Sequence, residues 1–378
     1  MIIEAFLYLS CLLYAAEYVL FLIGLGRVHR LPRAVPATYP TLSIVVAARN
    51  EEANIERCLG ALLRQDYPAD RFQIILVNDE SEDRTLVLAE KIAAANPERL
   101  IVLTTVPEST DARGKALAIA QGIDHATGEI ILLTDADCVP PPVWARSAVE
   151  HFVPGVDVYG GFTLIHSEDL FSSIQQLDWV HLQTYGSCGL ALDAPLGLIG
   201  NNFGFRRYAY DAVGGYRGIR FSMTEDYALF RAMFDHGFKV VFPCTHDTSM
   251  ITAPCSTLAD VLRQKQRWAH GGTETGVKGW SVLFFAVLMM ISMVVAPFIS
   301  TTAWIIVWST KFICDLILMT PNLRRLKRER QLRHFLTFEF YFIAQAFVIP
   351  FLLMNPTVMW KGRAYRGKSL KLEVRSEK

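Results

Sequence analysis

Residues 130–137 read Ile-Ile-Leu-Leu-Thr-Asp-Ala-Asp, an apolar run that ends in two aspartates one residue apart. The run is short and bounded by turn residues, which is typical of a buried strand. Similar runs lie at 42–47, 73–77 and 100–104, and helical patterns separate them. This alternation predicts an α/β fold with a mostly parallel, Rossmann-like sheet.

The first helical pattern follows the run at 42–47. Its apolar residues Ile55, Leu59 and Leu62 recur with helical spacing. We expect Glu51 and Glu52 to lie in the first turn of this helix, where carboxylates complement the helix dipole.

Polar residues follow three of the four predicted strands. These clusters are 49–51, 78–81 and 135–137. Any one of them could be an ordinary turn or helix cap. Ligands of such sheets bind at the carboxyl ends of the strands, so three clusters at one edge predict a binding site there.

The charge and cysteine content exclude some classes of function. The 37 basic and 37 acidic residues balance, and the aromatic residues are not interleaved with a basic stripe, so we expect no nucleic-acid partner. Seven cysteines are scattered without a CxxC pair. We interpret them as reduced structural residues, which suits a cytosolic domain.

Apolar segments at both ends predict membrane helices. Residues 1–26 are long enough to cross a bilayer and lack a signal-peptide cleavage site. The basic linker 27–40 then places the next domain in the cytosol. Residues 280–320 predict a transmembrane hairpin broken near Pro297, and a basic cytosolic loop follows at 321–334.

The last apolar segment leaves two alternatives open. If residues 335–354 crossed the membrane fully, the basic tail 355–378 would lie outside, against the positive-inside tendency. A re-entrant or interfacial segment would resolve the conflict. We expect a multi-pass integral protein of the plasma (inner) membrane of a bacterium, with a cytosolic catalytic domain.

The polar motifs resemble those of the family 2 glycosyltransferases with a GT-A fold. The group includes cellulose, chitin and hyaluronan synthases and ceramide glucosyltransferase. The resemblance covers 41–272, and we expect a catalytic domain at 41–255 followed by an amphipathic interfacial segment at 256–279. In the motif at Asp79, Asn78 stands where the commoner form of the family has a first aspartate. The motifs are Asp79, Asp135-Ala136-Asp137, Thr224-Glu225-Asp226 and Gln264-x-x-Arg267-Trp268.

The resemblance implies a role for each matching residue. It implies a divalent cofactor, Mg²⁺ or Mn²⁺, which neutralises the leaving diphosphate as a Lewis acid. An alternative for residues 264–268 is an interfacial helix with Trp268 at the headgroup level. The implied set is Arg49, Glu51, Asp79, Lys115 and Asp135 for the donor, Asp135 and Asp137 for the metal, Asp226 as general base, and Glu225, Gln264, Arg267 and Trp268 for the diphosphate or acceptor.

Three functions fit these motifs. The first is an inverting transferase that moves a sugar from a nucleotide sugar, UDP-linked by the resemblance, to a membrane lipid or other hydrophobic acceptor. The second is a processive polysaccharide synthase. The third is a non-catalytic nucleotide-binding membrane module. Such a protein would be expected to have lost the metal pair, the base or the Arg-Trp element, but this chain keeps all of them. Three or four membrane segments are few for a polymer channel, which favours the lipid acceptor.

Overall fold

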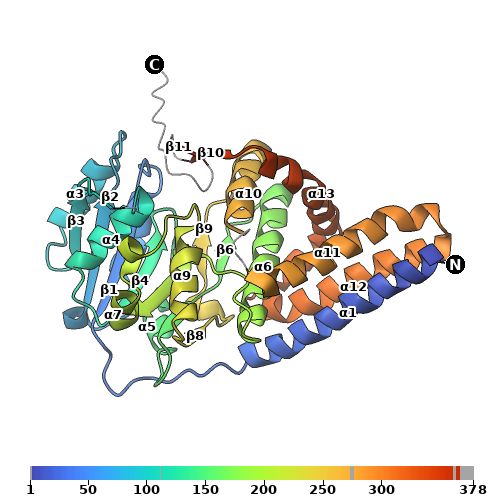
Figure 1. The fold of residues 1–378 in the computed structure, drawn as a ribbon. Coiled ribbons are helices and arrows are strands. Elements are labelled where there is room, and N and C mark those ends of the chain that lie inside the picture. Colours follow the sequence, from blue (N-terminus) through green and yellow to red (C-terminus); the bar gives the residue numbers. More distant parts are fainter. Residues whose placement is uncertain (1, 111, 273–275, 361–362, 367–378) are drawn as a thin grey trace.

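The structure is a computed structural model that describes residues 2–110, 112–272, 276–360 and 363–366. A sheet domain occupies one end of the molecule and a group of long helices the other (Figure 1). The elements in chain order are α1 (Ile2–Val28), β1 (Leu42–Ala48), α2 (Ile55–Leu63), η1 (Ala69–Arg71), β2 (Phe72–Asn78), α3 (Thr85–Ala94), β3 (Leu100–Thr104), α4 (Lys115–His125), β4 (Ile130–Asp135), α5 (Trp144–Val149), β5 (Val158–Gly160), β6 (Thr163–Ile165), α6 (Leu170–Leu190), η2 (Gly200–Asn202), β7 (Phe203–Arg206), α7 (Arg207–Ala212), α8 (Gly215–Gly218), α9 (Glu225–Asp235), β8 (Val240–Val241), η3 (His246–Thr248), β9 (Met250–Thr252), α10 (Leu258–Gly272), α11 (Gly276–Val295), η4 (Ala296–Phe298), α12 (Thr301–Arg325), η5 (Glu329–His334), α13 (Phe335–Met354), β10 (Thr357–Trp360) and β11 (Arg363–Arg366).

Within the described residues, the main sheet has seven strands in the order β3-β2-β1-β4-β7-β5-β8. The first four strands are parallel, whereas β7 is antiparallel to β4 and to β5. The strands β6 and β9 form a second, parallel pair. The predicted α/β fold with a mostly parallel sheet is therefore confirmed.

Successive residues of β1 enter separate cores on the two faces of the sheet. Val45 packs with α4, while Ile44 and Val46 pack with α2 and α5. The α4 side also includes Leu323 of α12 and Phe335 of α13, so one core continues from the sheet into the long helices. Both faces of the parallel strands are covered, which explains their continuous apolar sequence.

One expectation about the first helix is wrong. The helix α2 begins at Ile55, so Glu51 and Glu52 precede it, and Glu56 is the acidic residue of its first turn. The backbone N–H of Glu51 donates to Thr85 Oγ1 at 2.7 Å, and that of Glu52 donates to the Asp83 carboxylate. These bonds hold the two residues in a turn against the start of α3.

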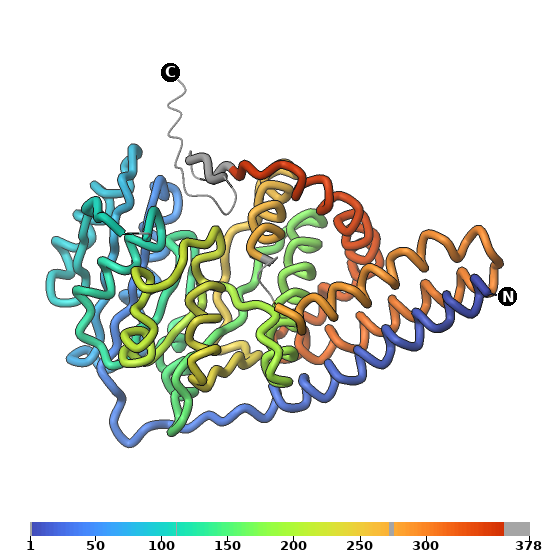
Figure 2. The backbone as a smooth tube through the Cα atoms, in the orientation of Figure 1, coloured from blue at the N-terminus to red at the C-terminus, as the bar shows by residue number. Residues whose placement is uncertain are grey.

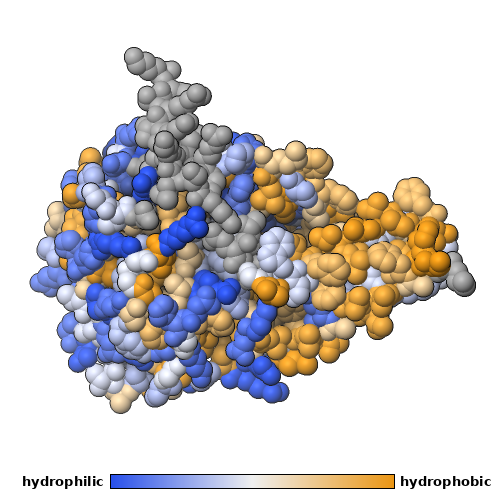
Figure 3. Space-filling model, in the orientation of Figure 1, coloured by the Kyte–Doolittle hydropathy of each residue, from blue (hydrophilic) through white to orange (hydrophobic). Residues whose placement is uncertain are grey.

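Four helices among the described residues are long and apolar enough to cross a membrane: α1, α11, α12 and the helix ending at Met354. The helices α11 and α12 form a hairpin, with a break at η4 that contains Pro297. The surface of this end of the molecule is largely hydrophobic, in contrast to the sheet domain (Figure 3). Residues 29–41 run from α1 along the outside of the sheet domain to β1 (Figure 2).

The helix α13 lies across the direction of α1, α11 and α12 (Figure 1) and packs mainly against α6 and α10. This helix belongs to one of the four candidate spans, and both alternatives for residues 335–354 stay predictions. Most of the predicted basic tail lies outside the described residues.

A charged cluster is fully buried where the long helices meet α6. Lys311 of α12 lies 2.5 Å from the Asp315 carboxylate and also pairs with Glu339 of α13. Tyr14 and Tyr18 of α1 donate hydrogen bonds to Asp315. The cluster therefore joins three of the candidate membrane helices through one ammonium and two carboxylate groups.

We predict that Lys311→Met destabilises the folded protein by about 3–5 kcal/mol, because two buried carboxylates then lack their ammonium partner. The double variant Lys311→Met/Glu339→Gln should regain much of this loss. The measurement is thermal unfolding in detergent, with Lys278→Met, which changes an exposed lysine of α11, as the control. Equal stability of Lys311→Met and the control would contradict the prediction.

Candidate active site

The carboxyl ends of β1, β2 and β4 lie side by side at one edge of the sheet. The strand β1 is central, since Ala48 pairs with Asn78 of β2 and Ala47 pairs with Asp135 of β4. Neighbouring strands are about 4.8 Å apart, so the ends of β2 and β4 are separated by about 10 Å. The three polar clusters of the sequence therefore meet at one edge.

The turns after β1 and β2 hold each other in unusual backbone conformations. Asn50 and Glu80 both have a φ of 52°. The N–H of Asn50 donates to Ser81 Oγ at 3.1 Å, and the N–H of Glu82 donates to Asn50 Oδ1 at 2.9 Å. Left-handed residues other than glycine persist where surrounding contacts fix them, and they are concentrated at ligand sites.

The residues expected to contact the nucleoside are gathered at these turns. Arg49 Nη1 donates to the main-chain oxygen of Asp79 at 2.8 Å. Asp79 and Glu51 are 5% and 8% exposed. The Glu51 carboxylate accepts a hydrogen bond from Asn54 Nδ2 at 2.8 Å. Their roles toward a nucleoside stay a prediction.

Lys115, the first residue of α4, connects two of the predicted motifs. Its Nζ lies 2.5 Å from Asp135 Oδ1 at the end of β4 and 3.3 Å from Glu225 Oε1 at the start of α9. Burial alone would lower the pKa of Lys115, but the charges of Asp135 and Glu225 outweigh it and raise that pKa above its usual value. The ammonium therefore stays charged and holds the two carboxylates together.

Asp226 lies beside Glu225 and accepts two backbone hydrogen bonds. Gly200 N–H donates to its Oδ2 at 2.6 Å, and Tyr227 N–H donates to its Oδ1 at 2.8 Å. Burial, with a further contribution from the charge of Glu225, raises the pKa of Asp226 to about 6. A carboxylate with this pKa is ionised at neutral pH and is a better proton acceptor than an ordinary aspartate.

The close approach of Asp226 depends on Gly200. A Cβ at position 200 would overlap the Asp226 side chain. The turn before β7 can therefore donate its N–H to the carboxylate only because this residue is glycine.

Asp135 and Asp137 provide oxygen ligands suited to Mg²⁺ or Mn²⁺. Both are partly exposed, while the intervening Ala136 is buried. Within the described residues, no group of three or more His, Cys, Asp or Glu side chains could hold a metal ion. The two aspartates fit an ion whose remaining ligands come from a bound diphosphate and water.

The helix α10 carries the Gln264-x-x-Arg267-Trp268 motif. Arg267 lies near Asp226, whereas Trp268 packs against α6. Arg267 lies close enough to Asp226 for its charge to lower the pKa of that carboxyl, opposing the effect of burial. The Trp268 ring packs edge-on against Trp179 of α6, with ring centroids 5.3 Å apart, and Lys265 Nζ lies 4.8 Å from the centroid of the Trp268 ring. Gln264 is partly buried.

A cleft opens between α4, α9, α10 and the residues before α9. It includes Lys115, Glu225 and Arg267 of the predicted set, whereas Gln264 and Trp268 do not line it. Arg113 was not predicted, although it lies only two residues before Lys115 of the predicted set. The lining residues are Arg113, Lys115, Ala116, Phe221, Ser222, Met223, Glu225 and Arg267.

The mostly parallel sheet and the carboxylates at its edge agree with the GT-A fold that the sequence motifs imply. Residues 43–227 match the family model described as glycosyl transferase family 2. The chain therefore carries a family 2 glycosyltransferase domain, as the sequence motifs predict.

Curated relatives include enzymes of two kinds. The chain is 29% identical over 250 residues to a beta-monoglucosyldiacylglycerol synthase of Synechocystis sp., covering 64% of this chain and 50% of the relative. It is 26% identical over 237 residues to a poly-beta-1,6-N-acetyl-D-glucosamine synthase of Staphylococcus aureus, covering 62% of this chain and 55% of that protein. The chain thus spans about half the length of these relatives.

A solved structure supports the fold over most of the chain. The mannosyltransferase PcManGT from Pyrobaculum calidifontis, in complex with GDP-Man and Mn²⁺, superposes with a TM-score of 0.56 at 18% identity, covering 89% of this chain and 98% of the other. The shared fold includes residues beyond the family 2 domain.

We predict that Gly200→Ala destabilises the protein by about 1–3 kcal/mol and displaces Asp226, because the added Cβ overlaps that side chain. Gly197→Ala is the matched control, since a Cβ there would meet nothing within 4 Å. Thermal unfolding of both variants is the measurement. Similar midpoints for the two variants would show that the turn tolerates a side chain.

Proposed function

We propose that this protein is a membrane-bound inverting glycosyltransferase that moves a sugar from a nucleotide-sugar donor, UDP-linked by family resemblance, to the hydroxyl of a membrane lipid. The observation that carries this proposal is the meeting of Asp135, Glu225 and Asp226 around Lys115, beside Arg267 of a helix packed against the apolar end of the molecule. The diacylglycerol-derived product in the name of one relative agrees with a lipid acceptor.

The proposed chemistry is a single displacement at the anomeric carbon. Asp226 accepts the proton of the acceptor hydroxyl as its oxygen attacks, and attack opposite the leaving group inverts the configuration. Arg267 donates charge-assisted hydrogen bonds to the phosphate oxygens. Asp135 and Asp137 would hold the divalent ion, which neutralises charge on the leaving diphosphate when bound. Arg49, Glu51 and Asp79 bind the nucleoside in this proposal.

The position of α10 supports acceptor access from the membrane side. Lys265 of α10 pairs with buried Asp178 of α6. Gln266 donates to the main-chain oxygens of Leu352 at 3.3 Å and Asn355 at 3.0 Å, at the end of α13. A lipid reaching the cleft beside these helices keeps its tails in hydrocarbon, which avoids a cost of about 0.8 kcal/mol per exposed CH₂. In this arrangement Trp268 and Gln264 lie on the acceptor side, and the sheet domain faces the cytosol of a bacterium.

The alternative is a processive polysaccharide synthase, favoured by the poly-N-acetylglucosamine synthase among the relatives. Its product would be a long water-soluble chain, whereas the lipid transferase adds a single sugar. The four candidate spans are few for shielding a hydrated polymer from lipid. We therefore propose the lipid acceptor.

We predict that Asp226→Asn lowers kcat by about 10² to 10⁴ while the donor still binds. Wild-type kcat/KM should fall as pH decreases through about 6, because a protonated Asp226 cannot accept a proton. The measurement is a pH profile of transfer together with donor titration, and Asp211→Asn, an exposed aspartate, is the control. Equal losses of donor affinity and turnover would make Asp226 a binding residue.

We predict that a chelator abolishes transfer and that Mn²⁺ or Mg²⁺ restores it, since Asp135 and Asp137 need an ion to hold a diphosphate. Asp137→Ala should also weaken Mn²⁺ binding in the presence of UDP, measured directly by electron paramagnetic resonance. Full activity in excess chelator would contradict the proposed metal site.

A further inference from the structure

The cleft wall contains three cations, and their surroundings differ. Lys115 is neutralised by Asp135 and Glu225, and Arg267 lies near Asp226. Arg113 also lines the cleft and is partly buried. In the part of the chain that the structure describes, its guanidinium has no ion pair or hydrogen bond.

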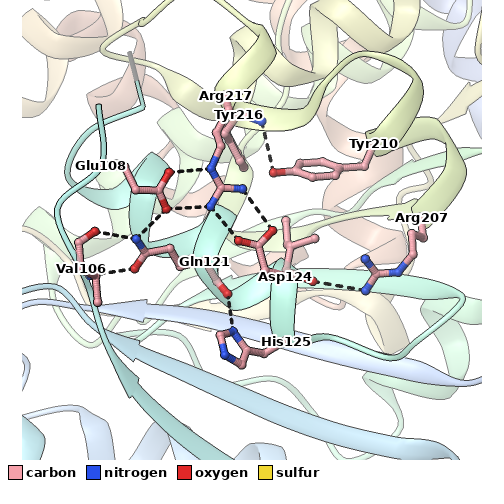
Figure 4. A network of polar contacts seen from close by, with 10 residues as sticks. Val106, Glu108, Gln121, Asp124, His125, Arg207, Tyr210, Tyr216 and Arg217 are labelled. Carbon is pink, nitrogen blue, oxygen red and sulfur yellow. Dashed lines mark hydrogen bonds and ion pairs between the residues drawn. The ribbon is translucent and has the colours of Figure 1, made fainter. Parts of the chain in front are cut away.

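Ion pairs connect the segment that precedes Arg113 to α8, and α8 to α4. Arg217 of α8 forms a two-pronged ion pair with Glu108, at 2.7 and 2.8 Å, and a second with Asp124 of α4, at 2.7 and 3.1 Å (Figure 4). Hydrogen bonding to Arg217 lowers the pKa of Glu108 to about 2, so this pair stays charged.

Gln121 of α4 holds the same segment at a second point. Its side chain accepts from the N–H of Val106 at 2.9 Å and donates to the main-chain oxygen of that residue at 2.6 Å. After Arg113, Gly114 turns the chain with a φ of 54° into α4. The segment before Arg113 is thus bound to α4 and α8 at Val106 and Glu108, Lys115 after it begins α4, and Arg113 itself lines the cleft.

An arginine placed in this way favours an anionic ligand. A partly buried cation without a counter-ion is unfavourable, and a bound anion removes that cost. The planar guanidinium offers parallel donors that match the oxygens of a phosphate group. Lys115 and Arg267 add positive charge to the same wall. The part of the cleft lined by Arg113 is therefore suited to bind a phosphate group.

We propose that Arg113 is a phosphate-binding residue, whose guanidinium holds a phosphate group of a bound substrate. This inference rests on the proposed function, in which the phosphate belongs either to the diphosphate of the donor or to a phosphorylated lipid acceptor. Arg113 would thus add a phosphate contact outside the motif residues named above.

The test is a binding measurement on the full chain in nanodiscs containing neither probe lipid. Wild type, Arg113→Gln and Arg113→Lys are titrated calorimetrically, in the presence of Mn²⁺, with UDP and with short-chain phosphatidic acid. Uridine and short-chain diacylglycerol are the phosphate-free counterparts. Arg64→Gln, which removes an exposed arginine at the end of α2, controls for the change in net charge.

Arg113→Gln should weaken the binding of one phosphate probe by about tenfold or more, as expected for lost charge-assisted hydrogen bonds. The phosphate-free probes should be unaffected, and Arg113→Lys should lose less because it keeps the charge. A loss confined to UDP identifies the donor diphosphate as the source, and a loss confined to phosphatidic acid identifies the acceptor.

The proposal is overturned if folded Arg113→Gln binds both phosphate probes within about twofold of wild type, or if wild type binds neither. Because no transfer is measured, failure of a separate transferase assay would not alter this result. If wild type transfers sugar normally but Arg113→Gln binds phosphate as wild type does, the proposed function stands and only the role of Arg113 is wrong.

Discussion

The site depends on one partly buried network of ion pairs, in which the Lys115 ammonium contacts Asp135 and Glu225. These three residues come from the start of α4, the end of β4 and the start of α9, which are far apart in the sequence. Without the ammonium, Asp135, Glu225 and Asp226 would repel one another in a poorly solvated cleft. Lys115 therefore holds Asp135 and Glu225 together, next to Asp226, the residue to which we assign the proton-accepting role in the proposed mechanism.

A second constraint connects this cleft to the apolar end of the molecule. The helix α6 contacts α1, α12 and α13, and its Asp178 and Trp179 hold α10 through Lys265 and Trp268. Arg267 is on the same helix and lines the cleft. The distance from the cleft to the candidate membrane helices is thus set by packed side chains rather than by a flexible linker, which suits a lipid acceptor.

The sequence predicts much of this arrangement because strand ends and membrane spans have local patterns. The apolar runs at 42–47, 73–77, 100–104 and 130–133 correspond to β1 to β4, and Asp79, Asp135 and Asp137 lie where β2 and β4 end. The prediction misplaces the start of α2 because Thr85 and Asp83, 34 and 31 residues further along, accept hydrogen bonds from the N–H groups of Glu51 and Glu52. No local pattern reveals such a partner.

Other features depend on distant contacts in the same way. The Lys311 cluster joins three helices, and periodicity on one helix does not show which residues face which. The close contact of Gly200 with Asp226 likewise requires the tertiary structure. Arg113 lies two residues before Lys115 of the predicted set, but only the structure shows that it lines the cleft.

The central claim is that this cleft transfers one sugar to a lipid, and product analysis tests it most directly. The purified chain in nanodiscs of defined lipids, including diacylglycerol, is incubated with Mn²⁺ and a panel of isotopically labelled nucleotide sugars. Mass spectrometry then follows the label. The account predicts a lipid carrying a single added sugar, formed by wild type and not by Asp226→Asn. Label in a long water-soluble polymer, or only in free sugar at the rate of the Asp226→Asn variant, would contradict it.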